Sequence, residues 1–300
     1  MKIRIRRILF PILFCLAVAC LIELPLAQTM LFGDDVILWD TLFRAIVAVP
    51  MLVHLYREDS VFRGKEHWNG KIAAAVFFGG AGVSTESGIP DFRSVDGLYN
   101  QQYDYPPETI ISHSFYRRNP EEFYRFYKNK MLFPEAKPNA AHLALAKLEQ
   151  QGKVRAVITQ NIDGLHQAAG SREVLELHGS VHRNYCTRCG TFFGLSDILG
   201  MNGVPRCECG GIIKPDVVLY EEGLDQETLQ KAVRYIQNAE ILIIGGTSLT
   251  VYPAAGLIDY YRGKKLVLIN KTATPMDERA DLVISAPIGE VFERFLTEGK

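Results

Sequence analysis

The chain has no excess of charge of either sign. Its 33 lysine and arginine residues are balanced by 34 aspartate and glutamate residues, so the net charge is -1. Proteins that bind nucleic acid usually concentrate positive charge to meet the phosphate backbone. We therefore expect no nucleic-acid partner. The sequence also lacks internal repeats and low-complexity tracts, which argues against a repeat array or a disordered linker protein.

Cysteine is scarce, and its distribution is uneven. Of the 6 cysteines in 300 residues, Cys15 and Cys20 lie in an apolar N-terminal run, and the other four fall between positions 186 and 209. Disulfide frameworks are typical of short secreted chains in which cysteine is dense. A group of four in a chain long enough for one large domain or two small ones favours a metal site.

Long apolar runs occur at the N-terminus. A basic start (Lys2, Arg4, Arg6 and Arg7) precedes one run at 8–27, and a second at 36–56 follows a short turn that contains Asp34 and Asp35 but no basic residue. About 20 apolar residues span a bilayer, and basic flanks stay on the cytoplasmic side. Residues 1–56 therefore predict a membrane hairpin, with residues 57–300 cytoplasmic and associated with the membrane through residues 8–56.

Three other interpretations of the N-terminus remain open. A cleaved signal peptide fits the basic start, and the stretch from Leu16 to Cys20 faintly resembles a lipoprotein cleavage site. Residues 35–56 also fit a soluble helix packed on a sheet. A fused or wrongly started reading frame is the third. If the hairpin does not form, we expect a soluble cytoplasmic protein.

The rest of the chain alternates between strand-like and helix-like patterns. Short, β-branched, apolar segments predict buried strands, and they occur at 72–78, 154–159, 174–177, 241–245, 265–270 and 282–285. Helical patterns separate several of them, at 140–150, 224–239 and 252–261. This order predicts an α/β fold with a doubly wound, mostly parallel sheet. Two insertions, at about 94–138 and 181–216, interrupt it.

A glycine-rich turn follows the first predicted strand. Gly80 and Gly82 permit a tight turn and a close backbone approach, and amides at the start of the next helix would face a pyrophosphate. By spacing alone an ordinary glycine turn fits as well, because Thr85 stands where a dinucleotide motif has its third glycine.

The four central cysteines form two close pairs. Cys186 and Cys189 are separated by two residues, whereas Cys207 and Cys209 are separated by one. Paired thiolates in glycine-containing turns suit a tetrahedral structural zinc ion. The alternative is four free buried cysteines.

Five segments together resemble the sirtuins, the NAD-dependent protein-lysine deacylases, and occur in family order over about residues 72–295. They are residues 79–93, 159–166, 177–180, 246–249 and 269–270, and residues 214–222 are similar to bacterial members. The resemblance implies a Rossmann-like large lobe and a small lobe, part zinc ribbon and part helical, in which Cys186, Cys189, Cys207 and Cys209 bind zinc. It also implies that the helical piece at 120–130 forms part of a lid over the nucleotide, although plain surface packing fits as well.

The resemblance also assigns site residues. Catalysis is implied for His178, the proton acceptor, and for Asn161. Contacts with the cosubstrate NAD are implied for Gly80, Ala81, Gly82, Asp91, Phe92, Arg93, Gln160, Asn161, Ile162, Asp163, Gly246, Thr247, Ser248 and Asn270. From the residues alone, Asn161 and Asp163 could instead close a helix-capping turn, and His178 could be structural.

The implied substrate is an acetylated lysine in a protein or peptide, bound as an added strand. The residues that match the family's substrate segments are Val217, Val218, Leu219, Tyr220 and Val251. Glu221 stands where many sirtuins have glycine, which puts peptide selectivity in doubt. Tyr99, Tyr103 and Tyr105 occur without an arginine between residues 95 and 105, which favours small neutral acyl groups.

The implied reaction removes the acetyl group and gives nicotinamide and O-acetyl-ADP-ribose. The acyl oxygen attacks the nicotinamide ribose, and His178 then takes a proton from the ribose hydroxyls. Two alternatives remain: NAD-dependent ADP-ribosyl transfer, which uses the same bond cleavage, and a non-catalytic NAD-sensing module.

Overall fold

A computed structural model describes residues 75–92, 97 and 105–298. The predicted N-terminal hairpin, the first part of the strand predicted at 72–78 and the predicted cofactor residue Arg93 lie outside these residues. None of the helices in the described part has the length and apolar character needed to cross a bilayer.

The main sheet has six strands in the order β3-β2-β1-β7-β8-β9, and every neighbouring pair is parallel. The predicted doubly wound sheet is therefore confirmed, and the predicted strands at 154–159 and 241–245 have the observed bounds. The strands are β1 (Ala75–Gly79), β2 (Val154–Thr159), β3 (Val174–Glu176), β7 (Ile241–Gly245), β8 (Lys265–Ile269) and β9 (Leu282–Ile284).

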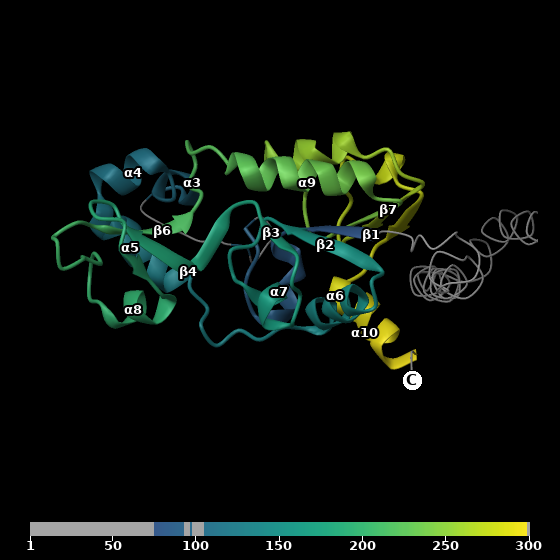
Figure 1. The fold of residues 1–300 in the computed structure, drawn as a ribbon, viewed down its shortest axis with the longest axis horizontal. Coiled ribbons are helices and arrows are strands. Elements are labelled where there is room, and N and C mark those ends of the chain that lie inside the picture. The colour runs from purple at the N-terminus through teal and green to yellow at the C-terminus, as the bar shows by residue number, and fades with distance from the viewer. Residues whose placement is uncertain (1–74, 93–96, 98–104, 299–300) are drawn as a thin grey trace, which may run out of the picture. The chain divides into compact units, whose positions relative to one another are not determined.

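Helices cover both faces of this sheet. Figure 1 shows α6 (Ala140–Gln150) and α10 (Ile288–Glu298) on one face and α9 (Gln226–Asn238) on the other. Ala232 and Ile236 of α9 pack on the apolar side chains of the central strands. Burying such side chains stabilises the fold by about 1.5–3 kcal/mol for each large aliphatic residue.

Two predicted helices take a tighter form. The segment after β1 consists of two 3₁₀ turns, η1 (Ala81–Val83) and η2 (Thr85–Ser87), instead of the expected helix. It cannot continue because Gly88 adopts a left-handed conformation with φ of 83° and Pro90 has no N–H to donate. The helix predicted at 252–261 is also 3₁₀, η4 (Ala254–Tyr260).

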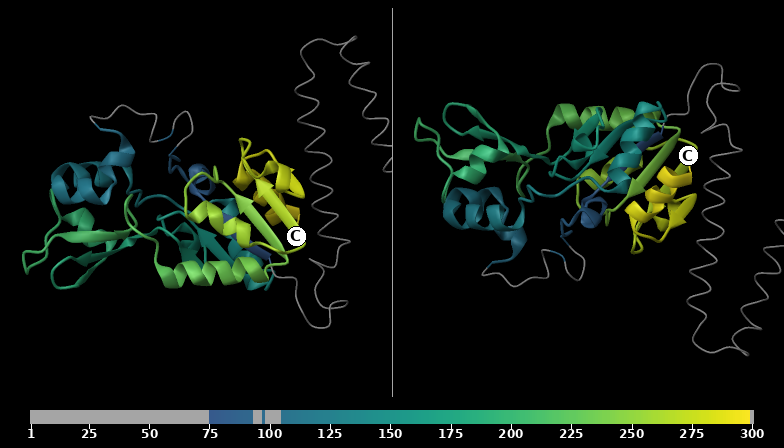
Figure 2. Two further views of the ribbon diagram at one scale, coloured as in Figure 1. Left: turned by 90° about the horizontal axis from the view of Figure 1, so that it is seen from above. Right: turned by 90° about the horizontal axis from the view of Figure 1, so that it is seen from below.

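The two insertions form a small lobe. A short antiparallel sheet in the order β5-β4-β6 packs with helices, and Figure 2 shows this lobe beside the main sheet in both views. The predicted helix at 120–130 is confirmed, and its Tyr124 and Tyr127 are buried in the small-lobe core. The elements are α3 (Pro107–Ile110), α4 (His113–Arg118), α5 (Pro120–Lys130), β4 (Gly179–Cys186), β5 (Phe192–Phe193), α8 (Leu195–Gly200) and β6 (Ile213–Val217).

Gly179, at the start of β4, is the position where the chain leaves the main sheet for the small lobe. Its φ is 76°, and a Cβ there would overlap the carbonyl oxygen of Asp216. We expect Gly179→Ala to lower the free energy of unfolding by roughly 2–4 kcal/mol, since backbone strain and a steric clash add. Urea denaturation monitored by circular dichroism measures this loss.

Gly190 provides the matched control. Its φ is 73°, but nothing lies within 4 Å of a Cβ built on it. Gly190→Ala should therefore cost only about 1 kcal/mol, the strain of the left-handed backbone. Equal losses in the two variants would contradict the steric argument.

Candidate active site

The predicted cofactor residues gather at one edge of the main sheet. Glycine turns follow β1 and β7, the segment 160–163 follows β2, and Asn270 follows β8. Parallel strands end at the same edge, which is where doubly wound folds bind ligands. The fold therefore brings together segments that are far apart in the sequence.

The two glycine turns pack against each other, backbone to backbone. The Gly82 N–H donates to the Gly246 carbonyl at 2.8 Å, and the Gly80 N–H donates to that of Gly245 at 3.3 Å. A Cβ on Gly82 would lie 2.8 Å from the Gly246 Cα. Gly82 and Gly246 therefore have to be glycine because of their contact with each other, whatever ligand the turns bind.

Ser84 is the centre of a buried hydrogen-bond network. Its hydroxyl donates to Asp163 Oδ2 at 2.7 Å and accepts from Asn161 Nδ2 at 3.0 Å. Asp163 Oδ1 accepts from the backbone N–H of Leu165 at 2.9 Å. Asp163 thus also closes the turn after β2, and the network fixes Asn161 and Asp163 relative to the glycine turn.

A second network joins the turn after β7 to the neighbouring strands. The Thr247 N–H donates to Asn270 Oδ1 at 3.0 Å, and Asn270 Nδ2 donates to the Thr247 carbonyl at 2.6 Å. Gln160 Nε2 donates to Thr247 Oγ1 at 3.0 Å. Asn270 therefore uses its amide to hold the turn. Ser248 is exposed, and its hydroxyl contacts that of Thr250.

His178 lies between the main sheet and the small lobe, just after β3. Its Nδ1 is 3.0 Å from the Gln160 carbonyl oxygen. A carbonyl only accepts hydrogen bonds, so Nδ1 carries the proton and Nε2 of the neutral ring has a free lone pair. Burial lowers the pKa of His178 from its ordinary value of 6.5, while the hydrogen bond to Gln160 opposes this shift. The ring is therefore neutral near pH 7 and can accept a proton at Nε2.

The other predicted site residues are divided between the main-sheet part and the small lobe. Phe92 and Ile162 are partly buried against the aromatic cluster of the small lobe. Asp91 and Ala81 are partly exposed. In the predicted substrate segment, Val217 and Leu219 point into the small-lobe core, whereas Val218 and Tyr220 alternate away from it. Val251 is half-buried in the turn before η4.

The sequence interpretation assigned no role to three residues of this network, Ser84, Asn139 and His142. Ser84 was inside the glycine motif. His142 Nε2 lies 3.5 Å from the Ser84 hydroxyl, and Asn139 caps α6 and contacts the other ring nitrogen of His142 at 3.0 Å. Burial lowers the pKa of His142 to about 4, although the charge of Asp163 opposes the shift. Asn139 was a usable sequence signal for the start of α6, but no local pattern predicts the contact between His142 and Ser84.

His166, in the same region, is fully buried, and neither of its ring nitrogens has a hydrogen-bond partner among the described residues. Its ring centroid lies 4.7 Å from that of His142. Burial is the main cause that lowers the pKa of His166 well below its usual range, and the neighbouring His142 lowers it further. Both rings are therefore neutral packing partners beneath the candidate site.

The four cysteines Cys186, Cys189, Cys207 and Cys209 meet in the small lobe, and their sulfur atoms all lie within 4.8 Å of one another. The sulfur of Cys209 is 3.4 Å from that of Cys186 and 3.5 Å from that of Cys189. Four thiolates at 2.3 Å from a tetrahedral metal ion would be about 3.8 Å apart. The arrangement can therefore hold one metal ion, with all four ligands from the protein.

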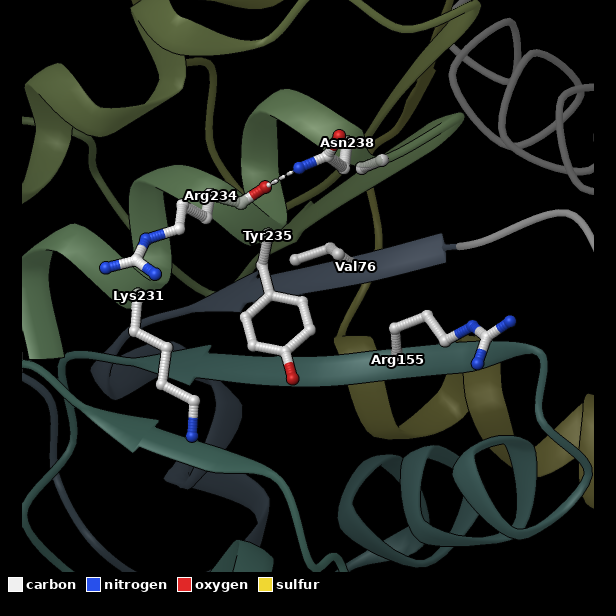
Figure 3. Close-up of a pocket in the computed structure, with 7 residues that line it drawn as sticks. Val76, Arg155, Lys231, Arg234, Tyr235 and Asn238 are labelled. Carbon is white, nitrogen blue, oxygen red and sulfur yellow. Dashed lines mark hydrogen bonds between the residues drawn. The ribbon is translucent and has the colours of Figure 1, made fainter.

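A hollow of about 450 Å³ lies elsewhere, between α9 and β2 (Figure 3). Its lining includes Val76, near the start of β1, and Tyr235 of α9. The glycine turns follow the other ends of the strands, so this hollow is separate from the candidate site.

Comparison with known proteins agrees with this geometry. A family model described as the Sir2 family matches residues 80–253. The chain is 60% identical over 225 residues to an NAD-dependent protein deacetylase of Clostridium acetobutylicum, covering 74% of this chain and 92% of the relative. It is 62% identical, with the same coverage, to the protein of that name from Clostridium perfringens.

Solved structures give the same result. One described as Sir2 with a p53 peptide and NAD⁺ has a TM-score of 0.67 and 44% identity, and it covers 75% of this chain and 93% of its own. Another, Sir2 bound to acetylated peptide, has a TM-score of 0.66 and 41% identity with the same coverage. The chain belongs to the Sir2 family.

Proposed function

We propose that the protein is an NAD-dependent protein-lysine deacetylase. The observation that carries the proposal is the state of His178: its Nδ1 is held by the carbonyl of Gln160, whose side chain binds the turn after β7, and its Nε2 is left as an acceptor. The relatives at 60% and 62% identity bear the name of that activity. The substrate is an acetylated lysine side chain in a protein or peptide, and water is consumed.

NAD supplies a nicotinamide leaving group and an ADP-ribose that accepts the acetyl group. On the protein, the turns at Gly80–Gly82 and Gly246–Ser248 would hold its phosphates and ribose, because glycine lets a ligand approach the backbone closely. Asn161 and Asp163 would orient the nicotinamide end, and Ser84 fixes both before binding. Such preorganisation lowers the barrier without a change of structure during the reaction.

His178 would accept a ribose hydroxyl proton at Nε2. In the imidazolium that forms, Nδ1 keeps its proton and still donates it in a hydrogen bond to the Gln160 carbonyl. The new positive charge is therefore stabilised by a hydrogen bond that already exists. Val217, Val218, Leu219, Tyr220 and Val251 would bind the acylated strand.

We further propose that the metal is zinc and that its role is structural. The four cysteine ligands leave no open position for a substrate. Cys186 and Cys207 pack with Ile198 and Ile213 in a small cluster of their own. A metal bound there would stabilise the fold of this part of the small lobe.

The activity is tested with the full-length protein, NAD and an acetyl-lysine peptide, with mass spectrometry of the products. We expect O-acetyl-ADP-ribose, and a loss of about 100-fold or more in kcat for His178→Ala, since general base catalysis contributes that much. NAD binding, measured by calorimetry, should persist in the variant. Transfer of ADP-ribose to the peptide, or NAD binding without turnover, would contradict the proposal.

The pH profile tests the role of His178. Because burial lowers its pKa below 6.5, the base stays neutral at pH 6.5 and is lost only as the pH falls further. The acid limb of kcat/KM should therefore lie below pH 6.5. A limb at or above that pH would mean that another group, or a differently placed imidazole, is the base.

Zinc is tested by elemental analysis. The purified protein should contain a near-stoichiometric amount of zinc, and Cys186→Ser should remove it and unfold the small lobe. In this variant the thermal unfolding transition of the small lobe should be lost, whereas the affinity of the large lobe for NAD should change little. A metal-free protein that stays folded and active would refute the assignment.

The N-terminal hairpin stays a prediction. Apolar residues 8–27 and 36–56 are its basis, and they lie outside the described residues. Fractionation without detergent should place the full-length protein with the membranes, whereas a chain starting at residue 57 should stay in the supernatant. Full-length protein in the supernatant would exclude the hairpin.

A further inference from the structure

The turn at the end of the candidate substrate segment has an unusual residue at its third position. The Glu222 N–H donates to the Leu219 carbonyl at 3.0 Å, which closes the turn, and Glu221 has a φ of 75°. Glycine is the usual residue for such a position, because a Cβ disfavours the left-handed conformation. A glutamate there needs a compensating interaction.

The carboxylate of Glu221 makes that interaction with α4. Its Oε2 accepts from the Ser114 N–H at 2.8 Å, and its Oε1 accepts from the Ser114 hydroxyl at 3.0 Å. Both carboxylate oxygens are thus used on one residue of the small lobe. A glycine at position 221 would fit the backbone but could not make this contact.

Neighbouring contacts attach the same turn to the same helix. The His113 N–H donates to the Tyr220 carbonyl at 3.0 Å, and Glu222 Oε1 lies 2.7 Å from His113 Nδ1. Lys214 Nζ donates to Glu222 Oε2 at 3.1 Å. The end of the segment is therefore fixed to α4 by two adjacent glutamates. Glu222 also accepts from Lys214 of β6, whereas the two carboxylate oxygens of Glu221 both contact α4.

The other end of the segment is attached to the candidate base. The Val218 N–H donates to the His178 carbonyl at 3.0 Å. Residues 218–220 are thus held at His178 on one side and at α4 on the other. The position of this segment sets where a substrate strand lies relative to the imidazole.

We propose that Glu221 is a positioning residue for the acylated substrate: by binding Ser114 it fixes the segment 218–220 at the distance from His178 that an acyl-lysine strand requires. This inference rests on the proposed deacetylase function and adds to it a residue in which the chain departs from the usual sirtuin pattern. Glu221 does not take part in the chemistry.

The test is a double-mutant cycle on the full-length protein with Ser114→Ala, Glu221→Gln and the double variant, together with Glu221→Gly. The KM for an acetyl-lysine peptide should rise about three- to five-fold in each Glu221 variant, the range of an exposed charged contact. The KM for NAD and kcat should stay within about two-fold. The double variant should be no worse than the weaker-binding single variant, because Ser114→Ala removes the hydroxyl half of a contact that the Glu221 change already weakens.

Glu221→Gly separates positioning from stability. Glycine relieves the strain of the left-handed backbone, so the melting temperature of Glu221→Gly should not fall below that of Glu221→Gln. Its peptide KM should rise at least as much as that of Glu221→Gln. The matched control is Glu227→Gln, an exposed glutamate in the first turn of α9, which should leave the peptide KM unchanged.

Three results would overturn the inference: an unchanged peptide KM, additive effects in the cycle, or a fall in kcat alone, which a purely structural role would give. The dissociation constant of a fluorescent acetyl-lysine peptide, measured by anisotropy in the same variants, makes the test independent of turnover. If the wild type gave no O-acetyl-ADP-ribose, the proposed function would fail, while the binding constants would still decide the role of Glu221.

Discussion

The contact between the two glycine turns is the constraint on which the candidate site depends. Gly82 and Gly246 approach so closely that any side chain on either would separate the neighbouring strands β1 and β7 at their carboxyl ends. The contact brings Thr247 within reach of Gln160, and Gln160 in turn holds His178. A continuous series of hydrogen bonds thus runs from the turn after β7 to the imidazole, and each member is fixed before any ligand arrives.

The polar groups beneath the site follow the same logic. Ser84, Asn161 and Asp163 satisfy one another, so burying them costs little free energy. His142 and His166 stay neutral because burial disfavours their charged forms. A charged His142 would attract the Asp163 carboxylate. Because the imidazole is neutral, the carboxylate stays available to Ser84 and to the turn after β2.

Much of the fold was predictable because its central strands are buried on both faces. β2 and β7 are short, apolar and rich in β-branched residues, and their observed bounds are those that the pattern predicts. The family resemblance predicted the convergence of the glycine turns and the cysteines. It could not predict the 3₁₀ turns after β1, which depend on how Gly88 and Pro90 end the segment. Nor could local patterns reveal that Asn270 holds Thr247, because that contact joins residues 23 positions apart.

The tautomer of His178 has a consequence for molecules designed to occupy the site. With Nδ1 committed to a backbone carbonyl, the only polar feature that the ring still offers to a ligand is the lone pair of Nε2. An inhibitor that fills this space with a carbonyl or a carboxylate would meet repulsion, whereas a hydroxyl or an amide N–H would find a partner. Compounds for this site should therefore carry one hydrogen-bond donor placed to reach Nε2, and this requirement follows from the backbone contact of Nδ1.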